Sequence, residues 1–163
     1  MSASGNRQAS HRGGNKDGHA PVYTNDMVLA GRLHPLLVHF PIALILVAGA
    51  GELIAMLTGR DAWHVVAIAN IRAGACVAVM AAVAGWLFAA SGIDSSDALE
   101  WHRWLGSGAA VVAAAAAFTS TRNRSRANVW LFRLTLIGAM TIVGLAAHVG
   151  AGLVWGADFL HPQ

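Results

Sequence analysis

Four long apolar runs constrain the fold of this chain more than any other feature. They cover about residues 33–57, 64–90, 104–120 and 129–155. About 20 residues of α-helix cross a hydrocarbon core of about 30 Å, and the shortest of these runs approaches that length. Only 12% of the residues are charged and 56% are hydrophobic, whereas about a quarter of a soluble domain is charged. The chain is therefore predicted to be an integral, multi-pass membrane protein embedded in a lipid bilayer.

The predicted fold class is all-α, an up-down bundle of four transmembrane helices within residues 31–163. Residues 1–30 differ in composition, because they are polar, rich in Gly, Ser and Asn, and lack an apolar core. Such a segment buries too little surface to offset the entropy lost on ordering. It is predicted to be a disordered tail.

The distribution of charged residues predicts the orientation of the bundle. We call face A the membrane face where the first helix begins, and face B the opposite one. The loops on face B and the start of the fourth helix hold five arginines: Arg60, Arg122, Arg124, Arg126 and Arg133. The loop on face A contains instead Asp94, Asp97, Glu100 and Arg103. The excess of arginine predicts that face B is cytoplasmic. Both termini would then be non-cytoplasmic, with the bacterial inner membrane as the expected location.

Four histidines from three different helices fall near face A. His34 and His39 lie at the start of the first helix, His102 precedes the third, and His148 lies about seven residues from the end of the fourth. Ionisable residues inside a span usually face the bundle interior and indicate a functional site. His64 falls on face B, where a single interfacial imidazole needs no functional explanation.

The sequence around His148 favours a haem as the ligand. Gly144 and Gly152 lie four residues before and after His148, so they share its helix face and leave a flat slot beside the imidazole. We predict His39 and His148 as axial ligands of a b-type haem iron, with His102 as the alternate ligand. His34 would be a ligand or a propionate partner. The alternative interpretation is that the glycines allow close helix packing and the histidines are interhelical hydrogen-bonding groups.

Several other polar residues in the apolar runs have predicted roles. Arg32 and Arg103 lie at the same membrane level as the histidines and could hold haem propionates. Pro41 removes a helical hydrogen bond and predicts a kinked or separately wound first turn. Glu52 and Arg72 lie at similar depths in consecutive helices. They are predicted to form an ion pair, because either charge alone would be costly in hydrocarbon.

Three segments of the chain resemble the domain-of-unknown-function family 2231, a family of small membrane proteins with four helices. They are "LHPLLVHFPIAL", "WHRWLG" before the third span and "HVGAGLVWG" at the end of the fourth. The resemblance covers about residues 32–157. Members occur fused or adjacent to c-type cytochrome and Rieske domains. The resemblance therefore implies membrane electron transfer, with such redox proteins and other membrane subunits as partners.

The predicted function is a haem-binding electron-transfer subunit of a larger complex, passing electrons between a quinone pool and a partner redox protein. We expect a redox or accessory subunit rather than a stand-alone enzyme, and no nucleic-acid partner. Two alternatives remain open from the sequence. One is a structural or assembly subunit without a cofactor. The other is a small proton-coupled transporter that uses Glu52 and the histidines.

Overall fold

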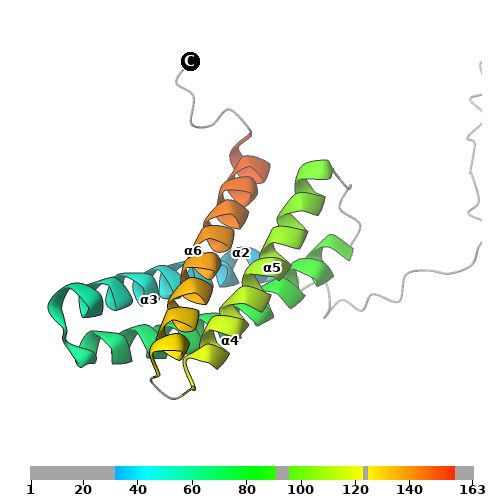
Figure 1. The fold of residues 1–163 in the computed structure, drawn as a ribbon. Helices are drawn as coiled ribbons and strands as arrows, with labels where there is room; N and C mark the ends of the chain where they lie inside the picture. Colours follow the sequence, from blue (N-terminus) through cyan, green and yellow to red (C-terminus); the bar gives the residue numbers. More distant parts are fainter. Residues whose placement is uncertain (1–31, 91–95, 123–124, 157–163) are drawn as a thin grey trace, which may run out of the picture.

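The helices of the protein form two antiparallel pairs. The structure, a computed structural model, describes residues 32–90, 96–122 and 125–156. Its helices are α2 (His34–Leu37), α3 (His39–Thr58), α4 (Asp61–Ala90), α5 (Asp97–Thr119) and α6 (Arg126–Trp155). Helix α3 pairs with α4 and α5 pairs with α6, and the two pairs pack together at an angle (Figure 1). The predicted all-α membrane bundle is confirmed, whereas the predicted tail lies outside the described residues.

Local sequence signals set the helix ends. Ser96 and Ser125 cap α5 and α6, where each hydroxyl accepts a hydrogen bond from the backbone N–H three residues later. Helix α3 ends at Gly59, which has a φ of 67° and closes the helix in the left-handed conformation that glycine adopts without strain. The short connection that follows makes α3 and α4 antiparallel neighbours.

Helix α5 differs from the prediction of four equivalent spans. Among the described residues, three helices are long and apolar enough to cross a membrane: His34–Thr58, Asp61–Ala90 and Arg126–Trp155. The predicted span 104–120 is the later part of α5, which begins earlier with a turn containing Asp97 and Glu100. Those charges, with His102 and Arg103 in the next turn, lower its mean hydropathy. The alanines of α5 are its buried apolar residues.

The first apolar run is interrupted where Pro41 predicts a disturbance. Helical hydrogen bonding breaks at Val38, between α2 and α3, and the next bond, from Ile42 N–H to the Val38 carbonyl, is long at 3.5 Å. Val38 itself keeps helical dihedral angles. Helix α2 is therefore a separately hydrogen-bonded turn that continues the direction of α3.

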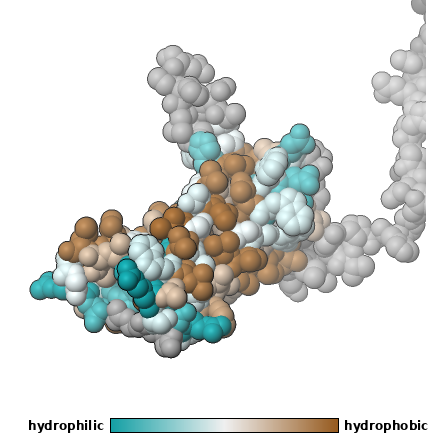
Figure 2. Space-filling view, in the orientation of Figure 1, coloured by the Kyte–Doolittle hydropathy of each residue, from teal (hydrophilic) through white to brown (hydrophobic). Residues whose placement is uncertain are grey.

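The interior of the bundle is built from small side chains, and the large apolar side chains point outward. Of the seventeen buried apolar residues within the described ranges, twelve are alanine. Leu36, Leu57, Val111 and Val154 are each more than 60% exposed. Figure 2 shows such apolar side chains covering the visible face of α5 and α6. This arrangement suits lipid, where helices associate through close packing of small residues.

The two helix pairs bury equivalent positions. A shift of 68 residues takes four of the five buried residues of α3 to buried residues of α5, namely Pro41, Ile45, Ala48 and Gly51 to Ala109, Ala113, Ala116 and Thr119. A shift of 65 residues takes five of the eight buried residues of α4 to buried residues of α6, namely Ala67, Ile71, Gly74, Ala78 and Ala81 to Phe132, Leu136, Ala139, Val143 and Ala146. The two helix pairs therefore repeat one pattern of buried positions, which we call the internal repeat.

Gly51 lies at a close approach between the backbones of α3 and α4. A Cβ placed there would lie 3.2 Å from the backbone oxygen of Trp63 and 3.3 Å from the backbone nitrogen of Ala67. Backbone cannot move aside as a side chain can. We expect Gly51→Leu to lower the free energy of unfolding by about 1–3 kcal/mol, the usual cost of overpacking. Detergent-denaturation titration followed by circular dichroism measures this.

Gly106 provides the matched control for Gly51, since a Cβ there meets nothing within 4 Å. Gly106→Leu should leave the denaturation midpoint nearly unchanged. An equal loss of stability in both variants would show that the contact between α3 and α4 is not responsible.

Candidate functional site

The structure brings two of the four face A histidines together. His34 lies on α2 and His102 near the start of α5, and their ring centroids are 6.0 Å apart at an interplanar angle of 79°. Both rings are half-buried. We call the end of the bundle that contains them the histidine end.

Each of these imidazoles is fixed by a backbone carbonyl of the neighbouring helix. The Nδ1 atom of His34 lies 2.8 Å from the carbonyl oxygen of Ala81 on α4. The Nδ1 atom of His102 lies 3.0 Å from the carbonyl oxygen of Ala146 on α6. A carbonyl oxygen can only accept, so Nδ1 donates in both rings. In a neutral imidazole this assigns the free lone pair to Nε2, the arrangement that metal-binding histidines use.

Glycines make room for both rings, and the repeat relates them. A Cβ on Gly85 would lie 2.8 Å from Cε1 of His34, and a Cβ on Gly150 would lie 2.8 Å from Cε1 of His102. The shift of 65 residues takes Ala81 to Ala146 and also Gly85 to Gly150. The shift of 68 residues takes His34 to His102. The same arrangement of a histidine, a carbonyl that accepts from it and a glycine that leaves space for its ring therefore occurs twice at the histidine end.

His39 and His148, predicted from the sequence as axial ligands, lie on the outside of the bundle. The side chain of His39 is exposed, and its Nδ1 donates to the carbonyl oxygen of Pro35, one turn earlier in the same segment. His148 is exposed on α6, two residues after Ala146. Gly144 and Gly152 have no neighbouring atoms within 4 Å of an added Cβ. Their side of α6 is thus open, as the predicted flat slot requires, and does not pack against another described helix.

Arg103 is the basic residue nearest in sequence to the His34–His102 pair. Its guanidinium carbon lies 3.8 Å from the ring centroid of Trp86. Its Nε atom is buried and has no hydrogen-bond partner among the described residues. Such an orphaned donor is uncommon and calls for a partner. Arg32, the other predicted propionate partner, is exposed just before α2.

The predicted ion pair between Glu52 and Arg72 is wrong. Glu52 Oε1 accepts a hydrogen bond from Nε of Arg133 on α6 at 2.8 Å, and Glu52 Oε2 lies 2.5 Å from Nδ1 of His64 on α4. Arg72 donates instead to the hydroxyl and the carbonyl of Ser120, at 3.0 and 3.3 Å. Successive helical residues are about 100° apart, so Arg72 lies about 80° around α4 from His64. The prediction rested on the similar depths of Glu52 and Arg72 in the membrane, and depth does not specify the direction in which a side chain leaves its helix.

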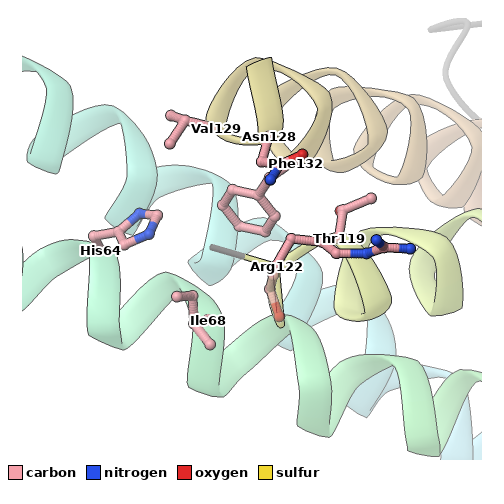
Figure 3. A pocket seen from close by; sticks show the side chains of 8 residues that line it. His64, Ile68, Thr119, Arg122, Asn128, Val129 and Phe132 are labelled. Atoms are coloured by element: carbon pink, nitrogen blue, oxygen red, sulfur yellow. The ribbon is translucent and has the colours of Figure 1, made fainter. Parts of the chain in front are cut away.

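His64 is the functional candidate that sequence reasoning missed. It is buried, packs edge-on against Phe132 at 5.7 Å between centroids, and contacts the only carboxylate buried among the described residues. It also lines a small hollow beside the connection between α5 and α6 (Figure 3). The signal available in the sequence was the spacing of 12 residues between Glu52 and His64, which places them on opposite sides of the short α3–α4 turn.

The donor sets limit the ligands that the described residues could hold. No group of three or more His, Cys, Asp or Glu side chains within the described ranges is placed to hold a metal ion. A pair of imidazoles is sufficient only where another group fills the remaining coordination positions. A porphyrin does this, leaving two axial positions.

Comparison with known proteins supports the membrane assignment. A family model described as predicted membrane protein (DUF2231) matches residues 31–159. No curated protein and no solved structure matches the chain.

Proposed function

Because the chain belongs to the DUF2231 family of predicted membrane proteins, we propose that it is a membrane electron-transfer subunit that binds b-type haem at its histidine end. One observation supports this above all others. Two imidazoles from different helices lie 6.0 Å apart, each with Nδ1 fixed by a carbonyl. That arrangement would leave the two Nε2 atoms available as ligands.

The ring separation fits one metal atom between two imidazoles. With metal–nitrogen bonds of about 2.0–2.1 Å and about 1.1 Å from nitrogen to ring centre, two opposed rings have centres about 6 Å apart. For this reason we favour His34 and His102 as the axial pair. The pair first predicted, His39 and His148, is the competing assignment, with the open side of α6 between Gly144 and Gly152 as its support.

The residues around the pair suit the anionic edge of a haem. The buried Nε of Arg103 has no hydrogen-bond partner in the part of the chain that the structure describes, and a propionate would supply a charge-assisted acceptor. Arg32 could hold the second propionate from the membrane surface. Bound haem would contribute one-electron transfer, and the axial imidazoles would set its potential range. The protein would thus exchange electrons with partner subunits, a c-type cytochrome or Rieske protein, and a quinone pool.

A specific observation also favours a second function, that of a cofactor-free assembly subunit. The bonds from His34 to Ala81 and from His102 to Ala146 each join two helices, as interhelical hydrogen bonds do in membrane proteins. In that case the histidines would serve packing alone.

An absorption spectrum of the purified protein separates the two functions. The protein is expressed with an ample haem supply and purified in mild detergent, and a reduced-minus-oxidised difference spectrum is recorded. We expect the α-band of b-type haem, with haem and protein in a fixed stoichiometry. A folded, monodisperse preparation without any such band would favour the assembly subunit and refute haem binding.

A further inference from the structure

A second polar cluster lies far from the histidine end, and the proposed function does not use it. Glu52 is 3% exposed and His64 is 8% exposed. Both oxygens of the Glu52 carboxylate are engaged, one by His64 from α4 and one by Arg133 from α6. The 18 residues between His34 and Glu52 correspond to about 27 Å of helix. This cluster is therefore separate from the proposed haem site.

The charges of this cluster are balanced for the binding of one proton. Arg133 is always charged, and it neutralises the Glu52 carboxylate when His64 is neutral. One added proton, on His64 or on Glu52, gives the cluster a single positive charge. Other charges on the neighbouring elements are Asp61, three residues before His64 on α4, Arg122, which lines the adjoining hollow, and Arg72, which is bonded to Ser120. His64 Nδ1 and Glu52 Oε2 are within hydrogen-bonding distance of each other, so one proton can pass between the two groups.

The hollow beside His64 provides a polar route to this pair. In Figure 3 it lies between α4 and the α5–α6 connection. Its lining includes the polar groups Thr119, Ser120, Arg122 and Asn128. Its free volume is about 30 Å³, and about 10–15 Å³ of such volume holds a water molecule. Water fits this space and a quinone ring does not, so the ligand that can reach His64 is a proton carried by water.

We propose that Glu52 and His64 form a proton-exchange site that communicates through this hollow with the aqueous phase beside the α5–α6 connection. The exchanged proton comes from water and returns to water, and no other bond changes. The site does not depend on bound haem. Arg133 positions the carboxylate through its hydrogen bond to Oε1.

Infrared difference spectroscopy of the full-length protein in lipid vesicles tests this proposal. Spectra recorded between neutral and mildly acidic pH should show a new band of either a carboxylic acid or a protonated imidazole. Glu52→Gln should abolish the band. His64→Gln keeps the pair between Glu52 and Arg133, and it should abolish an imidazole band or shift a carboxylic acid band. Should Glu52→Gln fail to fold, the His64→Gln spectrum decides alone.

The route through the hollow has its own test. Asn128→Leu places an apolar side chain in the lining, and it should slow the appearance of the band after a rapid pH change. Asn70→Leu is the matched control, because Asn70 bonds to the Val66 carbonyl on α4 and does not line the hollow. Absence of any band in the folded wild-type protein would overturn the proposal and make the cluster a fixed ion pair. Equal slowing by both variants would overturn the route.

Discussion

His34→Ala and His102→Ala should each remove the b-type haem spectrum, whereas His39→Ala and His148→Ala should leave it. Loss of one axial imidazole leaves an open iron position and removes a direct bond. Even loss of an outer hydrogen-bond partner typically costs about 10–100-fold in metal affinity, so loss of a ligand should cost at least that much. The measurement is haem content per protein together with the reduced-minus-oxidised spectrum.

The four variants distinguish the two ligand pairs because they share one fold and one chemical change. Haem loss in His39→Ala and His148→Ala, with retention in His34→Ala and His102→Ala, would assign the iron to the outer pair. Such a result would place the haem on the open side of α6 at Gly144 and Gly152. Adding free imidazole serves as a further control, since it can fill the cavity left by a missing ligand and restore the spectrum only where that ligand bound iron.

The helices and the histidine end follow from simple properties of the sequence. Length and hydropathy predict the elements, and alternating direction places His34 and His102 at one end. To predict that these two rings contact each other, one must also know the direction in which each side chain leaves its helix. Both rings turn inward because Gly85 and Gly150 leave space for them. His39 is five residues after His34, or about 140° around a helix, so it points outward.

The internal repeat was readable from the sequence but easily overlooked. The segments 81–85 and 146–150 read AAVAG and AAHVG, and they include the two carbonyls and the two glycines that hold the histidines. The rest of the repeat is almost invisible, because the core positions exchange Ile45 for Ala113 and Ala67 for Phe132. The two halves share the positions that are buried and not the residue types at those positions. An apolar sequence does not reveal which of its residues are buried.

Replacement of Glu52 by alanine should be the most destabilising single change in the bundle. It leaves the guanidinium of Arg133 and the ring of His64 without their shared acceptor inside the protein. Removal of one partner from a buried ion pair typically costs about 3–5 kcal/mol, because the remaining charge is uncompensated. Detergent-denaturation titration of wild type and variant, at neutral pH and equal lipid content, measures the loss.

Arg72→Ala is the control that decides between the observed pairing and the pairing predicted from sequence. Its bonds to Ser120 are exposed, so the variant should lose no more than about 1 kcal/mol. A double-mutant cycle between Glu52 and Arg133 should show strong coupling, and one between Glu52 and Arg72 should show almost none. Strong coupling in the second cycle would contradict the structure. It would mean that Glu52 turns toward the middle of α4 and away from α6, so that His64 would lose the carboxylate on which the proposed proton exchange depends.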